Sequence, residues 1–454
     1  MHESRTLSRF ACELDETQLS AAVLAKAKEF ILDQVGLMMG VATLPWSRVI
    51  CDYVRDWGEG KPEATVAHYG FRTKVENAVF ANSSFGHGFE MDDLYVYGSS
   101  HPGCIVVPTA LAMAEREGAS GRAMLGAVVA GYEVMGRINS AITPSCALRG
   151  FHAPTSITGP FGAAVAAGRL LGLDAERMLH ALSIAGSHAG GVTEYDQGGG
   201  SVKRMHAGMA AHGGVRSALL AQKGLTGPST ILEGKHGFIQ AFSDEQKLHE
   251  LTDGLGSDFR VVLGTGIKYY CACGPIHAGI DAMKALLAEH RFPAQDIRRI
   301  TFGTNRRSIS HVEARPTDIL AAQFSAAFSL ALTVLRGSNG FQDYTEQTLR
   351  DASILALADK VDLEIDPEVD KAYPGNRGAR VTVELADGRR LACKIDHCKG
   401  TPQNPLTRAE FEGKFRSVAG AVADAGRVER ILQLVNTLET QPDVRELVAL
   451  MCSP

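Results

Sequence analysis

Residues 103–138 read G-C-I-V-V-P-T-A-L-A-M-A-E-R-E-G-A-S-G-R-A-M-L-G-A-V-V-A-G-Y-E-V-M-G-R-I, and this stretch decides the fold. Apolar residues recur three and four positions apart over 105–116 and again over 121–138, as they do on one face of an amphipathic helix. Ser120 precedes the second pattern, where its hydroxyl can cap a helix. Because Ala, Leu and Gly dominate, such helices can approach each other closely. The stretch therefore predicts two consecutive, closely packed helices.

The same helical periodicity extends over much of the chain on both sides of this stretch. Asp174 stands where an N-cap residue is expected, directly before Ala-Glu-Arg. We expect nearly everything up to about residue 250 to be helical. The further predicted helices cover residues 17–42, 161–172, 175–190 and 207–223.

After residue 250 the pattern becomes mixed. Ala386-Asp387-Gly388 is a hairpin turn signal between two expected strands. Helical periodicity returns over 406–436, a segment that can pack back on the first part of the chain. The expected strands are 259–263, 297–304, 361–366, 379–385 and 390–397, and helices are expected at 276–291 and 317–336.

These patterns predict a mainly α protein with two domains. A large helical domain would be built from both ends of the chain, residues 1–264 and 401–454. A smaller α+β domain, residues 265–400, would be inserted between them. A cleft between two such bodies is the natural place for a small-molecule site.

Composition excludes several classes of protein. The 454 residues are 45% hydrophobic and 21% charged, as in an ordinary soluble globular protein. A formal net charge of −5 provides no basic field for nucleic acid or an anionic membrane. The N-terminal residues have no apolar core of signal-peptide length, and no apolar run approaches a membrane span, so we expect a cytoplasmic protein.

The nine cysteines form no C-x-x-C pair. Their odd number and irregular spacing favour reduced, mostly buried thiols. Cys271-Ala-Cys273 is too tight for the usual zinc knuckle. We therefore expect no metal site.

The strongest candidate for chemistry lies directly before the fold-deciding stretch, in the run G-H-G-F-E-M-D-D-L-Y-V-Y-G-S-S-H-P-G of residues 86–103. Glu90, Asp92 and Asp93 precede His101 by about ten residues. The Pro-Gly pair after His101 forces a bend, so the carboxylates and the imidazole can meet at one site. Acid and base groups on a bent loop suit proton transfer. The alternative is an acidic turn that caps a helix beside a surface histidine.

Two further segments place basic side chains near expected helix starts. His152 in G-F-H-A-P-T-S-I-T-G-P precedes a helix start, where backbone N–H groups suit a carboxylate; the alternative is a histidine of the cap region. Lys203, Arg204 and His206 follow a glycine-rich segment and form a plausible anion-binding cluster. A desolvated lysine there could also act as acid or base.

A third segment, G-I-K-Y-Y-C-A-C-G-P-I-H-A-G-I-D-A, places Lys268 and His277 around a Gly-Pro break. No phosphate-loop or dinucleotide-binding pattern occurs, and no G-x-S-x-G motif accompanies the histidines. The segments thus favour acid–base chemistry over nucleotide binding or a serine nucleophile.

Taken together and in order, these segments resemble the MmgE/PrpD family. The resemblance covers nearly the whole chain and includes H-G-F-E-M-D-D, H-P-G-C-I-V-V-P-T-A-L-A-M-A-E, V-K-R-M-H-A-G-M-A-A-H-G-G, I-K-Y-Y-C-A-C-G-P-I-H-A-G-I-D-A and Q-N-P-L-T. The family includes 2-methylcitrate dehydratases, cis-aconitate decarboxylases and an iminodisuccinate epimerase. It implies a helical domain, a smaller α+β lid domain, a homodimer, and chemistry without metal or organic cofactor.

The resemblance also implies roles for site residues. His101 or His152 would transfer the proton, while Lys203 and His277 would bind carboxylates and stabilise carbanion-like charge. These four are the expected catalytic residues. The residues expected to orient the histidines or to bind substrate are Glu90, Asp92, Asp93, Arg204, His206 and Lys268.

The chain departs from the family pattern at several positions. Where the pattern reads D-F-D-D-T, this chain has Glu90 as the first acid and Leu94 in place of the hydroxyl residue. Ala153 is an extra residue after the G-F-H histidine, and Phe328 replaces a tyrosine expected in Q-F-S-x-x-Y. A site that lacks a hydroxyl donor loses discrimination, so the departures affect substrate identity most.

The sequence thus predicts a cofactor-independent lyase, a dehydratase or decarboxylase, that removes or delivers a proton next to a carboxylate of a small di- or tricarboxylate. An isomerase or epimerase would use the same proton transfer and lose no group. A protein that binds carboxylates without catalysis is a third reading, opposed by the joint presence of the four expected catalytic residues.

Overall fold

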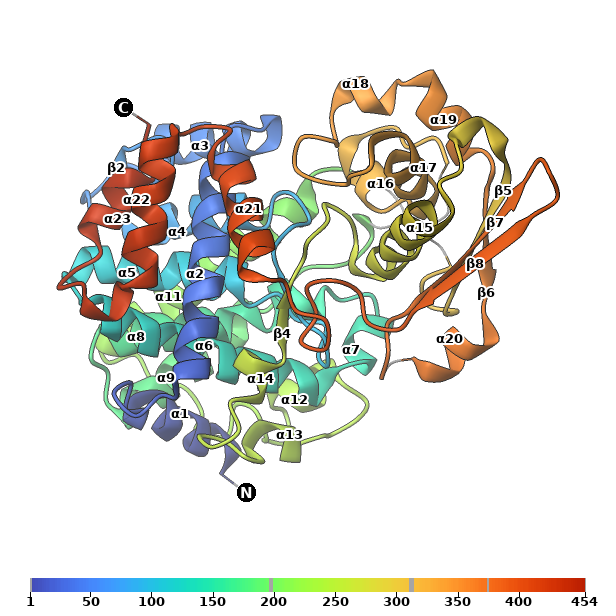
Figure 1. The fold of residues 1–454 in the computed structure, drawn as a ribbon. Coiled ribbons are helices and arrows are strands. Elements are labelled where there is room, and N and C mark those ends of the chain that lie inside the picture. The colour runs from blue at the N-terminus through green and yellow to red at the C-terminus, as the bar shows by residue number, and fades with distance from the viewer. Residues whose placement is uncertain (1, 196–198, 310–313, 374, 454) are drawn as a thin grey trace. The chain divides into compact units, whose positions relative to one another are not determined.

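The computed structural model describes residues 2–195, 199–309, 314–373 and 375–453. They form two compact units. The first unit combines Met1–Thr265 with Glu412–Pro454, and the second comprises Gly266–Phe411. Helices predominate over strands (Figure 1), which confirms the mainly α class.

The first unit consists of helices joined by loops and a few short strands. β1 (Ala64–Thr65) and β2 (Arg72–Thr73) pair antiparallel, and β3 (Asp93–Tyr95) begins at the last of the three clustered acids. The described α-helices of this unit are α1 (Glu3–Glu13), α2 (Ala21–Val41), α3 (Pro45–Trp57), α4 (Val75–Gly86), α5 (Gly103–Glu117), α6 (Gly121–Ile142), α7 (Ser145–Leu148), α8 (Gly159–Leu170), α9 (Ala175–Ala185), α11 (Val202–Gln222), α12 (Phe238–Phe242), α13 (His249–Thr252), α14 (Arg260–Leu263), most of α21 (Arg408–Ala419), α22 (Ala425–Asn436) and α23 (Arg445–Leu450).

The helices expected from the fold-deciding stretch are confirmed as α5 and α6. The Ser120 hydroxyl accepts a hydrogen bond from the Ala123 N–H at 3.2 Å, as an N-cap should. Asp174 caps α9 in the same way, since its carboxylate accepts from the Arg177 N–H at 2.8 Å. α8 packs tightly on α11, and both pack on α5. The red C-terminal helix α22 lies against the blue α2 (Figure 1).

The strand expected at 259–263 is wrong, because residues 260–263 form the short helix α14. The first turn of a helix leaves N–H groups without partners in the helix. Here the buried carboxylate of Glu133, on α6, accepts from the N–H groups of Val261 and Val262 at 2.9 and 3.0 Å. This contact across the fold overrides the strand preference of the two valines.

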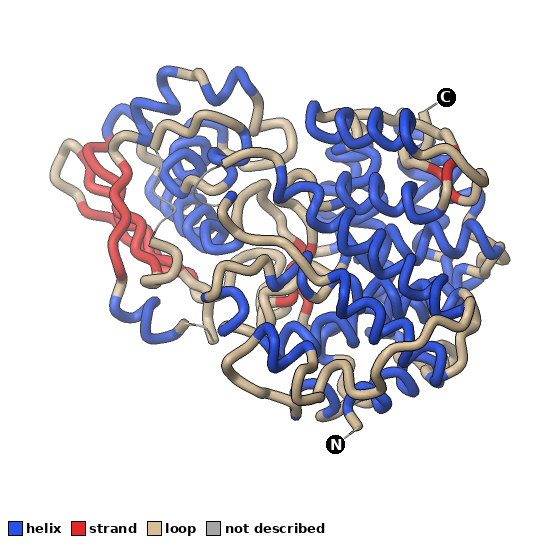
Figure 2. Tube along the Cα trace, turned by 180° about the vertical axis from the view of Figure 1, so that it is seen from behind, coloured by secondary structure: helices blue, strands red, loops and turns tan. Residues whose placement is uncertain are grey.

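The second unit contains a four-stranded sheet in the order β6-β5-β7-β8, which Figure 2 shows in red. β5 (Ile297–Thr304) pairs parallel with β6 (Val361–Ile365) and antiparallel with β7 (Ala379–Leu385). β7 and β8 (Arg390–Ile395) form the expected hairpin, and Gly388 in its turn has a φ of 89° that suits glycine. The four strands expected in 297–397 are therefore confirmed.

Helices cover this sheet. α15 (His277–His290) packs on β7 and β8, and α17 (Ala326–Arg336) packs beside α15. The single helix expected at 317–336 is interrupted, because Ser325 starts a new helix by accepting a hydrogen bond from the Phe328 N–H at 2.9 Å. The remaining elements of this unit are most of β4 (Thr265–Ile267), α16 (Ile319–Gln323), α18 (Glu346–Leu349), α19 (Ala352–Ala358) and α20 (Pro367–Ala372).

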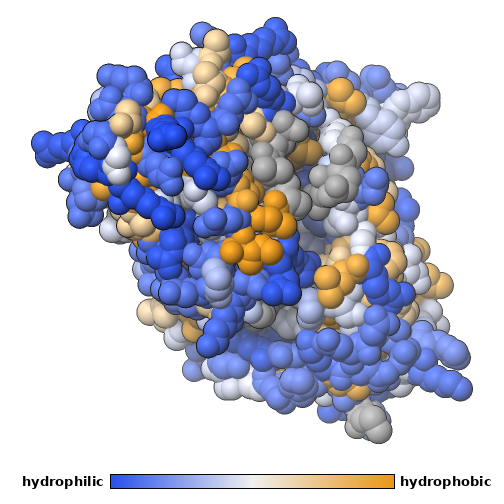
Figure 3. Space-filling model, turned by 90° about the vertical axis from the view of Figure 1, so that its right-hand side faces the viewer, coloured by the Kyte–Doolittle hydropathy of each residue, from blue (hydrophilic) through white to orange (hydrophobic). Residues whose placement is uncertain are grey.

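None of the described helices combines the length and the apolar composition that a bilayer span requires. The face turned toward the viewer in Figure 3 is covered mostly by hydrophilic residues, with smaller hydrophobic areas among them.

The close approach of α11 and α8 can be tested at Gly214. A Cβ atom there would meet the Cβ of Ala163 and the carbonyl oxygen of Pro160. We expect Gly214→Ala to lower the free energy of unfolding by about 1–3 kcal/mol through overpacking. Gly413, exposed on α21, is the matched control because a Cβ there meets no atom within 4 Å.

Gly413→Ala should raise the free energy of unfolding by about 0.5–1 kcal/mol, since alanine is the better helix former. Urea denaturation of both variants makes the comparison. If Gly214→Ala were as stabilising as Gly413→Ala, the two helices could not approach as closely as described.

Candidate active site

The acidic run forms a buried loop directly after α4. We call Glu90–Asp93 the acid loop. All three of its carboxylate residues are buried, each at most 3% exposed. Glu90 has a φ of 54°, in the left-handed region that residues other than glycine adopt only when their surroundings hold them there. The structure places the three predicted acids together in one buried loop, and the left-handed backbone at Glu90 is a feature that the sequence pattern did not indicate.

Asp92 lies between two imidazoles. The His87 Nδ1 is 2.7 Å from the Asp92 Oδ2, and the His101 Nδ1 is 3.5 Å from the same oxygen. The rings of His87 and His101 lie 5.5 Å apart between centroids. His87 is not among the residues expected from the sequence. The sequence offered one hint. His87 stands five residues before Asp92, directly after the residues that form α4, from where its ring can reach that carboxylate.

The tautomer of His101 follows from its hydrogen bond. Its Nδ1 lies 2.6 Å from the backbone carbonyl oxygen of Asp93. A carbonyl oxygen only accepts, so Nδ1 carries the proton and donates it. In the neutral ring Nε2 is then the atom that can take up a proton, and the Asp92 carboxylate lies beside the ring.

Asp93 serves a different purpose from Asp92. Its carboxylate accepts from the Gly103 N–H at 3.0 Å and from the Tyr132 hydroxyl at 2.8 Å. Burial, followed by the charge of Asp92, raises the pKa of Asp93 well above its ordinary value. Asp93 thus ties the acid loop to the N-terminus of α5 and holds the bend that the Pro-Gly pair predicts.

His152 and His206 form a second, buried pair, with their Nδ1 atoms 2.8 Å apart. Two N–H groups cannot point at each other, so one ring donates and the other accepts. Burial first, and then the neighbouring His87 and His206, lower the pKa of His152 well below its ordinary value. Burial, then His87 and Lys203, lower the pKa of His206 to about 4. Both rings are therefore neutral at neutral pH.

Lys203 connects this pair to the acid loop. It lies in the first turn of α11, three residues before His206, and its ammonium group forms an ion pair with the Glu90 carboxylate. Both side chains are buried, at 6% and 3% exposed. A lysine in such a place supplies positive charge in a region of low dielectric, where it acts strongly on a neighbouring anion.

Arg204 makes contacts that the sequence did not suggest. Its guanidinium donates a hydrogen bond to the carbonyl oxygen of Gly88 and stacks on the Trp46 ring, 3.6 Å from the centroid. Arg204 therefore supports the backbone between His87 and the acid loop.

Lys268 and His277 belong to the second unit, where both are buried. Lys268 directly follows β4, and His277 is the first residue of α15. The Nε2 of His277 donates to the carbonyl oxygen of Ala272 at 2.9 Å, which in the neutral ring makes its Nδ1 the proton acceptor. Their proposed roles remain predictions.

A metal ion would find one set of three clustered donors among the described residues. The ligand atoms of His87, Asp92 and Cys104 lie within 4.8 Å of one another, and all three residues are buried. Since His87 already donates to Asp92, these two groups are engaged with each other in this structure. The expectation of a metal-free site stays a prediction.

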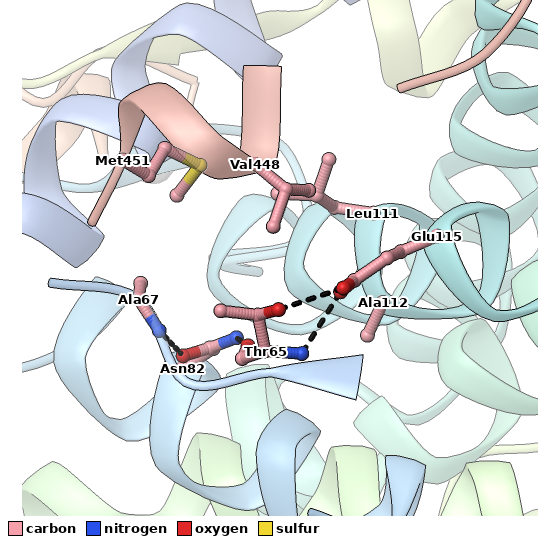
Figure 4. Close-up of a pocket in the computed structure, with 8 residues that line it drawn as sticks. All are labelled: Thr65, Ala67, Asn82, Leu111, Ala112, Glu115, Val448 and Met451. Atoms are coloured by element: carbon pink, nitrogen blue, oxygen red, sulfur yellow. Dashed lines mark hydrogen bonds between the residues drawn. The ribbon is translucent and has the colours of Figure 1, made fainter. Parts of the chain in front are cut away.

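A small pocket elsewhere in the first unit carries no candidate residue. In Figure 4 its polar groups bond one another: the Glu115 carboxylate accepts from the Thr65 N–H at 2.8 Å and from the Thr65 hydroxyl at 2.7 Å, and the Asn82 side-chain oxygen accepts from the Ala67 N–H at 2.9 Å. These groups satisfy one another and link β1 to α4 and α5.

The chain is similar to known proteins over almost its whole length. Residues 5–251 match the model of the MmgE/PrpD N-terminal domain, and residues 270–440 match that of the MmgE/PrpD C-terminal domain. A cis-aconitate decarboxylase-like protein of Aspergillus oryzae is 30% identical over 98% of this chain and 96% of its own length. The cis-aconitate decarboxylase of Aspergillus terreus is 30% identical over 99% and 95%. The Homo sapiens cis-aconitate decarboxylase is 26% identical over 96% and 92%.

The lowered pKa of His206 predicts a pH dependence of stability. As the pH falls below 6.5, His206 takes up a proton in the unfolded chain but resists protonation in the folded chain until about pH 4. Stability from this residue is therefore complete above pH 6.5 and is lost toward pH 4, by at most about 3 kcal/mol.

We expect His206→Asn to lose less stability than the wild type between pH 7 and pH 4.5 in urea denaturation. The matched control is His249→Asn, because the His249 side chain is 64% exposed, and this variant should keep the wild-type pH dependence. Equal pH dependence of all three proteins would contradict the lowered pKa.

Proposed function

The chain belongs to the MmgE/PrpD family, and on that basis we propose that it is a lyase acting on a small di- or tricarboxylate. The reaction would be a decarboxylation or a dehydration that depends on proton transfer next to a carboxylate. The relatives at about 30% identity, which carry the name cis-aconitate decarboxylase or cis-aconitate decarboxylase-like protein, support the decarboxylase reading.

One observation supports this proposal most. Acid, base and cationic groups, all buried except the partly buried His101, meet within a single unit: His101 with Asp92, His152 with His206, and Lys203 with Glu90. Proton transfer needs a base with a defined tautomer, and charge stabilisation needs a cation shielded from water. Both requirements can be met by these residues.

His101 would transfer a proton in either reaction, but in opposite directions. In a decarboxylation the carbon–carbon bond to one carboxylate breaks, CO₂ leaves, and the remaining electron pair takes a proton from the charged His101 ring. In a dehydration the neutral His101 Nε2 removes the proton next to a carboxylate, and hydroxide leaves as water after protonation by a second acid. The Lys203 ammonium would stabilise the enediolate-like charge in both cases.

The substrate would resemble cis-aconitate without having to be identical to it. Leu94, in β3, offers no hydroxyl where the family pattern has threonine. Phe328 is fully buried in α17 and packs 6.1 Å from the Tyr344 ring, centroid to centroid. Both differences remove a hydrogen-bond donor, which favours a carboxylate with a different pattern of polar groups.

Proton NMR in D₂O with a panel of carboxylates tests the function. The panel contains cis-aconitate, 2-methylcitrate, citrate, iminodisuccinate and small hydroxy- and amino-dicarboxylates. New vinyl signals or the loss of a carboxyl carbon would identify a lyase and its substrate. Deuterium exchange without a change of skeleton would instead identify an isomerase or epimerase, and ligand-induced stabilisation without turnover would identify a binding protein.

We expect His101→Ala and Lys203→Ala to reduce kcat by at least about 100-fold, because each removes a group proposed to act on the reacting atoms. The controls His249→Ala and Lys26→Ala change a histidine and a lysine outside the candidate site and should turn over like the wild type. Wild-type kcat in either site variant would remove that residue from the mechanism.

We also propose that the enzyme is a homodimer. One face of α3 carries Val49, Tyr53 and Trp57, which are spaced four residues apart and are 69%, 59% and 78% exposed. Such an apolar stripe is unusual on a monomer surface and supports burial by a partner. Analytical ultracentrifugation should give twice the mass of one chain, and Trp57→Glu should weaken the dimer. A wild-type protein that sediments as a monomer would contradict the proposal.

A further inference from the structure

We propose that Lys414 is a positioning residue of this enzyme, which holds the acid loop in its active conformation through the backbone carbonyl of Met91. This inference rests on the proposed function for its kinetic readout only. Lys414 lies on α21, more than 300 residues after the acid loop in the sequence.

The contacts of Lys414 are short and buried. Its Nζ donates to the Met91 carbonyl oxygen at 2.6 Å and to the Asp33 Oδ1 at 2.6 Å. The side chains of Lys414 and Asp33 are each 3% exposed. Lys414 therefore joins three segments of the first unit: α21, α2 and the acid loop.

The hydrogen bond from Lys414 to Met91 acts at the centre of the acid loop. Met91 lies between Glu90, which has the left-handed backbone, and Asp92, which faces His101. A residue in such a conformation keeps it only where neighbouring contacts compensate. Lys203 holds the Glu90 side chain, and Lys414 holds the next carbonyl group. The loop is thus held by two lysines from helices far apart in the sequence.

A buried lysine at this place does not have to contribute to stability. Burial raises the pKa of Asp33 to about 6, an effect that the nearby Lys414 opposes, so burying this pair carries a desolvation cost. Replacing a buried ion pair by neutral residues of similar size is often neutral for stability. A role in positioning and a role in stability therefore predict different results for a charge-neutral double variant.

The experiment compares Lys414→Met, the double variant Asp33→Asn/Lys414→Met, and the control Arg416→Met. Arg416 lies two residues further along the same helix, its side chain is 42% exposed, and it pairs with Glu412 and Glu429 at the surface. Three quantities are measured: the urea midpoint, kcat and KM on the carboxylate that the wild type converts, and amide hydrogen exchange of the peptide spanning residues 87–95.

We expect Lys414→Met to lower the urea midpoint, because a buried carboxylate loses its partner. Its kcat should fall about 10- to 100-fold with a much smaller change in KM, since misplacing catalytic groups by about 1 Å has effects of this size. The double variant should recover most of the midpoint but not kcat. Exchange in residues 87–95 should be faster than wild type in both, and Arg416→Met should match the wild type throughout.

Two results would overturn the proposal. Recovery of kcat together with the midpoint in the double variant would show that Lys414 contributes only to stability. Wild-type exchange rates of residues 87–95 in both Lys414 variants would show that the loop does not depend on this lysine. The exchange measurement needs no substrate, so it decides the question even where the wild type converts no carboxylate and the proposed function fails.

Discussion

The buried ion pair between Lys203 and Glu90 is the interaction on which the rest of the candidate site depends. Both side chains are buried, so the two opposite charges compensate each other in a region of low dielectric. The pair fixes the start of α11 against the acid loop, and one turn later His206 meets His152. The same loop then presents Asp92 to His101. Removing either member of the pair would take this compensation away from a buried charge in the middle of all these contacts.

Much of the fold could be predicted because helix periodicity is a local property. The helices α5 and α6 follow from apolar spacing and from a cap at Ser120, both of which lie within the segment itself. The error at Val261 and Val262 has the opposite cause. Their helix forms because Glu133, more than 120 residues away, accepts their N–H groups. No local pattern can contain that partner.

Some residues of the candidate site could likewise be predicted from the sequence, and others could not. His101 could be found because acids and a Pro-Gly bend stand near it in the sequence, whereas His152 and Lys203 were linked to it by the family pattern. His87 and Lys414 could not be found so easily. His87 ends a helix, and Lys414 sits among the charged residues of an ordinary amphipathic helix. Their contacts with the acid loop are hydrogen bonds that exist only after folding.

The return of the chain to its first unit after Phe411 has a consequence for synthesis on the ribosome. The acid loop leaves the exit tunnel long before α21 is translated. Until then the carbonyl of Met91 lacks the ammonium group that completes its surroundings. The nascent chain can therefore assemble α4, α5 and α11 early, yet the contact from Lys414 to the acid loop forms only after α21 has been synthesised. A chain released before that point would lack this support of the acid loop.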